Sequence, residues 1–287
     1  MTRTILIAIL IFITGSAASQ KVLTLEEAIS IAIKNNLDVA QTGLQADVAA
    51  INLRQAKNNK LPTINGTITH GINQGRSIDP FSNAYINQKI NYAAYGLGGD
   101  LILFNGLTLK NAIRQNAFAF DASKMDLEQA KDNLRLAVIL AYLQVLSNED
   151  QVGIAKKQIE VTQAQLDRLE KLNKEGAISP PQLYDIKGQL KEAELNEMEA
   201  RNAWAASKLQ LCQLMTLPYD ANLQLQRVDA AEMMEKFPLT LNDVMVKAAQ
   251  SLAGIKAADL RIKSAEAAVR LSKGALLPTL SLGSNLN

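Results

Sequence analysis

The sequence predicts a mostly α-helical protein with a smaller β part, and three features indicate this class. A stretch of helix-forming residues from about Leu107 to Lys174 contains no proline and a single glycine, Gly153. Two segments, one on each side of residues 74–89, alternate apolar and polar side chains as strands do. The region before the first of these segments recurs near the end of the chain. Together these features favour long helices and paired strands over a compact mixed fold.

The composition excludes several classes of function. The chain has 287 residues and a formal net charge of +2, from 30 Lys and Arg against 28 Asp and Glu, so it lacks the basic excess that favours nucleic acid as a partner. Its one cysteine, Cys212, allows neither a disulfide within the chain nor a cysteine-based metal site. His70 is the only histidine and has no nucleophile beside it in the sequence. We therefore predict no catalytic residues, no cofactor and no metal site.

Residues 1–19 are predicted to be a signal peptide. Arg3 supplies a short positive region, Ile5–Ile13 an apolar segment too short to span a bilayer, and Gly15–Ser19 a stretch of small residues suited to cleavage. The mature protein is therefore expected to be exported. No later segment approaches about 18 consecutive apolar residues, so a membrane-spanning helix is not expected. The exported chain is then periplasmic, secreted, or threaded into the outer membrane as β-strands.

An internal repeat without gaps sets the organisation of the chain. Leu23–Leu25 recurs as Leu239–Leu241, and Leu61–Thr63 recurs as Leu277–Thr279, so both pairs are separated by 216 positions (239 − 23 and 277 − 61). A shared spacing at both ends is not expected by chance. It indicates a duplicated structural unit.

Each copy of the repeat begins with a predicted helix. Thr24 and Thr240, each followed three residues later by an acidic side chain, are typical N-cap residues because their oxygen atoms accept from free amides of the first turn. Residues 20–61 are predicted to hold the N-terminal helices of the first repeat. Residues 239–287 are predicted to begin a second repeat that is cut short, since they contain no counterpart of the long segment after Pro62 in the first copy.

Residues 62–105 are predicted to form two strands joined by a long polar loop at 74–89. One face of the first strand is apolar, and the other face is polar and includes Asn65, Thr67 and Thr69. Such alternation is typical of a strand between lipid and a wet lumen, and equally of a sheet between a core and solvent. Each segment has the roughly 10 residues that a tilted strand needs to cross a bilayer. Two strands cannot satisfy their own edges, so further strands are expected beside them.

Residues 106–217 are predicted to form a long antiparallel helical hairpin. The apolar spacing of a coiled coil runs through both helices, at Ile159, Thr162, Leu166 and Leu169, and then at Leu183, Ile186, Leu190 and Ala193. At about 1.5 Å per residue the first helix reaches on the order of 100 Å.

The tip of this hairpin is predicted at 175–181. Gly176 can end the first helix in a left-handed conformation, and Ser179 can cap the second helix with Pro180 at its first position. The residues after the hairpin, 218–238, are predicted to form a short connector in which Leu223, Leu225 and Val228 alternate as in a small strand.

The predicted chain contains a strand pair, then a long helical hairpin, and then a repeat of the unit. This order of elements resembles that of the TolC family of outer-membrane efflux proteins. The local features of that family are visible at Leu61–Thr63 before the first strand, at Leu103–Gly106 after the second, and at Gly176–Ser179 in the helix tip. The resemblance covers essentially the whole chain after the predicted signal, apart from the missing second half. It implies a TolC-like α/β-barrel protomer: mostly α, with two transmembrane β-strands and one coiled-coil hairpin per repeat.

The resemblance also implies a function. Three protomers of this family close a 12-stranded barrel in the bacterial outer membrane above a helical tunnel in the periplasm. The chain is then expected to be a homotrimeric channel in contact with outer-membrane lipid, serving a tripartite efflux pump or a type I secretion system. A periplasmic adaptor and an inner-membrane transporter are the implied partners, and drugs, other small molecules or proteins are the implied cargo.

The resemblance assigns roles to two groups of residues. Family members dock adaptors through the hairpin tips, which places that role on Glu175, Gly176, Ala177, Ile178, Ser179 and Pro180. Gly176 and Ser179 are interpreted equally well as turn residues only. Expected lumen-facing residues are Asn65, Thr67, Thr69 and Asp100, and a charge such as Asp100 is tolerated where it meets lumen water.

Two other classes of protein also contain long helical hairpins. One is the periplasmic adaptor of a tripartite pump, and the other is a coiled-coil scaffold of the cell envelope. Adaptors flank their hairpin with lipoyl-like half-motifs and usually begin with an inner-membrane anchor, and neither is evident here. Both alternatives also leave the segment at 63–104 without a role, whereas a barrel needs it.

Overall fold

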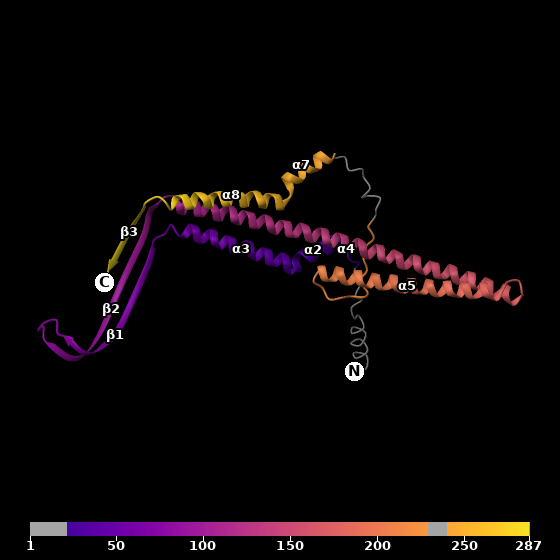
Figure 1. Ribbon diagram of the computed structural model, residues 1–287, viewed down its shortest axis with the longest axis horizontal. Coiled ribbons are helices and arrows are strands. Elements are labelled where there is room, and N and C mark those ends of the chain that lie inside the picture. The colour runs from indigo at the N-terminus through magenta and orange to yellow at the C-terminus, as the bar shows by residue number, and fades with distance from the viewer. Residues whose placement is uncertain (1–21, 229–239, 287) are drawn as a thin grey trace, which may run out of the picture. The chain divides into compact units, whose positions relative to one another are not determined.

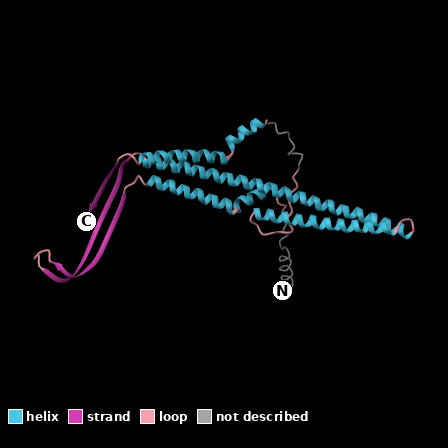
Figure 2. Ribbon diagram, in the orientation of Figure 1, coloured by secondary structure: helices cyan, strands magenta, loops and turns pink. Residues whose placement is uncertain are grey.

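A computed structural model describes residues 22–228 and 240–286 (Figure 1). The predicted signal peptide and the second half of the predicted connector lie outside the described residues. Figure 2 shows helices over most of the described chain and strands gathered in one sheet. The elements are α2 (Leu25–Asn35), α3 (Leu37–Asn58), β1 (Thr63–Ile78), β2 (Tyr85–Asn105), α4 (Thr108–Lys174), α5 (Pro180–Leu214), α7 (Leu241–Ser251), α8 (Ala253–Gly274) and β3 (Thr279–Leu286).

The chain divides into two compact units. Unit 1 comprises Met1–Ala40 with Ala130–Thr240, and unit 2 comprises Gln41–Gln129 with Leu241–Asn287. Helices α3 and α4 contribute residues to both units. None of the helices within the described ranges combines the length and apolar character that crossing a bilayer requires.

The sheet belongs to unit 2 and has the order β1-β2-β3, with both pairs antiparallel. The predicted strand pair is therefore present, but the predicted loop at 74–89 is wrong, because β1 continues to Ile78 and β2 begins at Tyr85. Main-chain hydrogen bonds form a ladder whatever the polarity of the side chains, so the polar sequence did not end the strands. Asp79 closes the short turn, since its Oδ1 accepts from the Phe81 amide at 2.9 Å and its Oδ2 from the Ser82 hydroxyl at 2.8 Å.

The passage from β2 into α4 is a tight turn in unit 2. Gly106 and Leu107 both have a positive φ, 62° and 66°. The backbone of Gly106 lies directly against that of Gly274, and a Cβ at Gly274 would lie 2.5 Å from the Gly106 carbonyl oxygen. Only residues without a Cβ allow this approach. It fixes the point at which the end of α8 meets the start of α4.

Helix α8 is held along the first part of α4 by polar contacts within unit 2. The Gly254 amide donates to Gln129 Oε1 at 2.9 Å, and the Ser264 hydroxyl donates to the Gln115 carbonyl at 3.0 Å. An exposed ion pair joins Arg261 to Asp126 at 2.6 Å. Exposed pairs of this kind stabilise by at most about 1 kcal/mol, so they orient the helix more than they hold it.

The N-terminal helices begin as the sequence predicts. Thr24 and Glu27 form a capping box in which each side chain accepts from the other residue's amide, at 3.1 and 3.3 Å. Asn36 interrupts the helix, and its Oδ1 accepts from the amides of Asp38 and Val39, the first turn of α3. These local bonds explain why residues 20–61 contain two helices in place of one.

The predicted coiled-coil seam is confirmed in unit 1. Leu166, Ile186 and Leu190 form a buried cluster, against which Ile159, Leu169 and Leu183 pack. Thr162 and Ala193, the remaining predicted seam residues, are also buried. An ion pair between Lys187 and Glu170, at 3.3 Å, crosses the two helices. The hairpin is therefore antiparallel, with the packing that the spacing predicts.

Candidate functional site

The four predicted lumen residues share one face of the sheet. Directly paired residues of antiparallel strands point to the same side. The register pairs Thr63 with Asp100, Asn65 with Gly98, Thr67 with Gly96, and Thr69 with Ala94. Asp100 therefore lies on the same face as Asn65, Thr67 and Thr69, although 31 or more positions separate it from them in the sequence (100 − 69).

Side chains on this polar face lie flat over the glycines opposite them. A Cβ at Gly98 would lie 2.6 Å from Asn285 Oδ1, and one at Gly283 would lie 2.9 Å from Asp100 Oδ1. The ring of Tyr92 covers Gly71 in the same way. The resulting surface is polar and shallow, which suits the water-filled side of a membrane sheet.

The opposite face of the sheet is largely apolar and exposed. Ile64, Ile68 and Tyr95 are 72%, 79% and 68% exposed. Strand β3 continues this face with Leu282 and Leu286, which lie opposite Leu101 and Leu97 of β2. An apolar face of this extent is not stable in water and needs an apolar cover. A bilayer provides one, as it does for the outer face of membrane-spanning strands.

The predicted tip residues lie together in the turn between α4 and α5. Gly176 has φ 73°, its amide donates to the Asn173 carbonyl at 3.1 Å, and the Ala177 amide donates to the Leu172 carbonyl at 2.9 Å. This is a Schellman motif, as expected for a glycine at this position. Ile178 is half-buried, whereas the exposed members of the tip are Glu175, Gly176, Ala177, Ser179 and Pro180.

One detail of the tip differs from the prediction. Ser179 occupies the N-cap position of α5 and Pro180 comes next, but the Ser179 side chain makes no capping hydrogen bond. The Gln182 amide donates instead to the Ser179 carbonyl at 3.2 Å. Pro180 and Pro181 lack amide hydrogens, so fewer donors of the first turn need a cap. The hydroxyl of Ser179 is thereby left at the surface.

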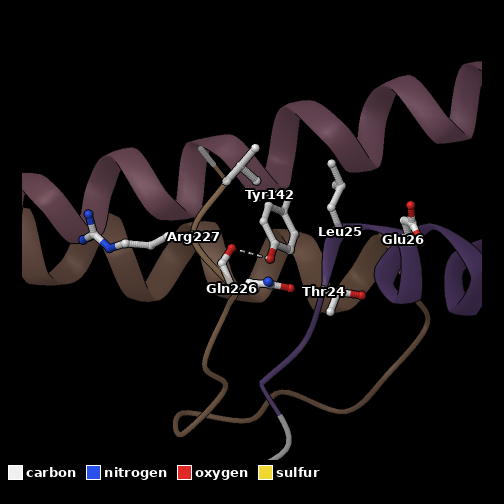
Figure 3. A pocket seen from close by; sticks show the side chains of 7 residues that line it. Thr24, Leu25, Glu26, Tyr142, Gln226 and Arg227 are labelled. Carbon is white, nitrogen blue, oxygen red and sulfur yellow. Dashed lines mark hydrogen bonds between the residues drawn. The ribbon is translucent and has the colours of Figure 1, made fainter. Parts of the chain in front are cut away.

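A cleft in unit 1 lies where the chain enters α2 (Figure 3). Tyr142 of α4 forms its wall, and Figure 3 shows the Tyr142 hydroxyl directed at Gln226. The hydroxyl is 2.7 Å from the Gln226 carbonyl oxygen and 2.9 Å from that of Leu23. Burial raises the pKa of Tyr142, although the bond to Gln226 opposes this, so the hydroxyl remains a neutral donor. It ties two strand-like segments to α4, and we call Tyr142, Leu23 and Gln226 the connector clamp.

The predicted small strand of the connector is reduced to one bridge. Leu225 pairs with Leu23 in a single parallel bridge, and no longer strand forms among the described connector residues. Lys208 of α5 secures the connector at a second point. Its buried ammonium group donates to the Ala221 carbonyl at 3.0 Å and lies 3.7 Å from the centre of the Trp204 ring. Burial lowers the pKa of Lys208, and the charges of Glu149 and Asp220 oppose that shift.

The connector clamp was missed by sequence reasoning. Tyr142 fits the apolar spacing of its helix, which indicates only a core residue. A signal was present, because a buried tyrosine hydroxyl needs a hydrogen-bond partner. The partners lie 119 and 84 positions away, so spacing and motifs could not identify them.

The chain combines a helical hairpin with a sheet that has one polar face and one exposed apolar face, the distribution that strands in an outer membrane need. The profile of the outer membrane efflux protein family matches residues 28–216, and the chain belongs to this family. Its place is accordingly the outer membrane.

Two relatives support the assignment. The chain is 28% identical over 169 residues to the pyoverdine export outer membrane protein OpmQ of Pseudomonas putida, which covers 58% of this chain and 34% of OpmQ. It is 24% identical over 178 residues to the outer membrane protein TolC of Salmonella enteritidis, which covers 61% of this chain and 36% of TolC. The chain thus spans about a third of the length of the curated relatives that it matches.

The fold is also found among solved structures. The Campylobacter jejuni CmeC outer membrane channel matches with a TM-score of 0.75 at 17% identity, covering 90% of this chain and 55% of CmeC. At this identity the likeness concerns the fold. It confirms the predicted fold class, a mostly helical TolC-like protomer with a β-barrel part.

Proposed function

We propose that the chain belongs to an outer-membrane channel protomer that exports small molecules or proteins, within a tripartite efflux pump or a type I secretion system. The observation that carries this proposal is the two-sided sheet. Its apolar face is exposed and its polar face is lined by Asn65, Thr67, Thr69 and Asp100. A sheet between lipid and a wet lumen needs this distribution of side chains.

The assembly we propose is a homotrimer. The outer edges of β1 and β3 have no strand partner among the described residues, and a strand edge in a bilayer must be paired. Strands of neighbouring protomers, or of the same protein beyond this chain, would supply those partners. The polar faces of all protomers would then line one lumen, with the helices in the periplasm. A periplasmic adaptor or a coiled-coil scaffold would leave the apolar face of the sheet without a cover.

The proposed action is passive conduction, with no catalysis by the chain. An inner-membrane transporter would drive the cargo, and a periplasmic adaptor would join it to the channel at the hairpin tip. Exposed Glu175, Ala177 and Ser179 give this tip a surface that a partner can reach. OpmQ is named as a pyoverdine export protein. The similarity to OpmQ supports export as the general role proposed for this chain.

The experiment that tests the tip is a charge reversal in the full-length protein. Glu175→Lys should abolish efflux of a fluorescent substrate and adaptor cross-linking, because a reversed charge at a docking surface repels its partner. Glu199→Lys, on an exposed position of α5 away from the tip, is the matched control and should retain both. Both variants should reach the outer membrane as heat-modifiable trimers. Unchanged adaptor cross-linking in Glu175→Lys would remove the docking role.

A further inference from the structure

Two cations lie on the apolar face of the sheet near its turn, between Ile72 and the pair formed by Ile78 and Tyr85. The register pairs Gln74 with Lys89 and Arg76 with Asn87, so Arg76 and Lys89 are diagonal neighbours across β1 and β2. Alternation along β1 places Arg76 on the same face as Ile72. Diagonal neighbours in a sheet lie about 7–8 Å apart, so both cations can contact one anionic group.

No acidic side chain offsets these two cations within the described strands. Asp100 is the only carboxylate in β1, β2 and β3, and it lies on the polar face. Asp79 lies in the turn, where its carboxylate accepts from Phe81 and Ser82. Neither cation forms an ion pair with another described residue. The pair therefore presents two positive charges outward.

An aromatic ring supports the arginine. The Arg76 guanidinium lies 4.7 Å from the centre of the Tyr85 ring, on the same face of the hairpin. Stacking of this kind orients a guanidinium and leaves the N–H groups at its edge free to donate. A guanidinium so oriented binds phosphate in a bidentate manner, and Lys89 adds a point charge.

The position along the strand matches the edge of a bilayer. Ile64 lies opposite Gly99, so Leu101 extends the apolar face by two residues beyond Ile64. From Leu101 to Ile72 the face covers ten residues (72 − 64 and 101 − 99), about 34 Å along the strand and about 25 Å along the membrane normal at the usual tilt. The hydrocarbon band of such sheets is about 25 Å tall, so Ile72 lies at its edge. Arg76 lies about 10 Å further along the normal, among the lipid head groups.

The connections of the strands indicate on which side of the membrane the two cations lie. Helices α3 and α4 join the sheet through residues next to Thr63 and Asn105, the ends opposite to the 79–84 turn. Under the proposed function these helices are periplasmic. The turn and the two cations then lie at the outer surface of the membrane.

We infer that Arg76 and Lys89 form a binding site for the phosphate groups of an anionic lipid in the outer leaflet, in particular a phosphorylated glycolipid. The inference rests on the proposed function, because it needs the sheet in the outer membrane with its helices in the periplasm. The site anchors the outer end of the strand hairpin against the lipid and sets how deep the sheet inserts.

The test measures lipid binding by the full-length trimer purified from outer membranes. The probes are lipid A with two phosphates, phosphatidylcholine, and inorganic phosphate, each titrated and followed by native mass spectrometry. Arg76→Gln with Lys89→Gln should weaken binding of lipid A roughly tenfold or more, since each cation near an anionic surface contributes to the attraction. Lys156→Gln with Lys256→Gln removes the same charge from exposed positions of α4 and α8, and should leave binding unchanged.

Each outcome decides between this inference and the proposed function. Equal binding of lipid A by the variant and the wild type, or equal binding of phosphatidylcholine and lipid A, would overturn the lipid site. If inorganic phosphate bound as tightly as lipid A, the site would be one for a free anion, and the lipid site would be overturned. Efflux is measured in the cells from which the outer membranes are prepared, and heat-modifiable trimers are measured in those membranes. If the wild type shows both and only the lipid result fails, the proposed function stands; if the wild type never inserts, both fail.

Discussion

The two copies of the repeat have the same secondary structure and different burial. Helices α2 and α7 each have 11 residues, α3 and α8 each have 22, and each helix of the second copy begins 216 positions after its counterpart (241 − 25 and 253 − 37). Ala28 and Ala32 of α2 are completely buried. None of the α7 residues is buried, and Val244, at the position of Ala28, is 37% exposed.

This contrast indicates that local sequence sets a helix and that its neighbours set its burial. Helix α2 comes directly after the connector clamp, in which Leu23 is fixed by Tyr142 and by the bridge to Leu225. Leu239, the counterpart of Leu23 before α7, lies outside the described residues. The copies also differ where the second helix ends, because exposed Asn58 corresponds to buried Gly274. Exchanging equivalent residues between the copies tests each part of this comparison.

The largest effect is expected at the ends of α3 and α8. Gly274→Asn adds a Cβ 2.5 Å from the Gly106 carbonyl oxygen, and a backbone atom cannot move aside as a flexible side chain can. We expect a loss of about 3 kcal/mol in the free energy of unfolding. The reciprocal Asn58→Gly should cost only about 0.5–1 kcal/mol. Denaturant midpoints of the two variants in detergent would measure both, and equal losses would contradict the close approach.

An intermediate effect is expected inside the first helix of each copy. Ala32 and Ala248 are identical residues at equivalent positions, but only Ala32 is buried. Ala32→Leu should destabilise by about 2 kcal/mol, because a well-packed site has no room for a larger side chain. Ala248→Leu should stay within about 0.5 kcal/mol of the wild type. Thermal unfolding of the pair is the measurement. A larger loss for Ala248→Leu would show that the second copy is the more tightly packed.

The smallest effect is expected at the break between the two helices. Asn36 caps α3 through two amides, whereas Leu252, at the equivalent position before α8, makes no side-chain cap. Asn36→Leu should therefore destabilise by about 1 kcal/mol, and Leu252→Asn should stabilise by up to about 1 kcal/mol. Hydrogen exchange of the first-turn amides of α3 and α8 would track the change. Changes of the same sign in both variants would exclude capping as the cause.

Much of the fold was predictable because the signals are local. The seam at Leu166, Ile186 and Leu190 results from helical spacing, and the tip results from the left-handed preference of glycine at Gly176. The shared face of Asn65 and Asp100 results from alternation in each strand, which the register brings together. Their roles in docking and in the lumen stay predictions, since they depend on partners and on assembly.

Local sequence was enough to specify where most helices and strands begin, which residues form the seam, and that the unit is repeated. Capping, periodicity and turn geometry act within a few residues, so one chain segment carries each signal. Three features emerged only from tertiary contacts: residues 74–78 and 85–89 remain in strands, Tyr142 holds Leu23 and Gln226, and α2 has buried residues where α7 has none. These outcomes depend on partners remote in the sequence, whose positions are fixed only when the chain folds.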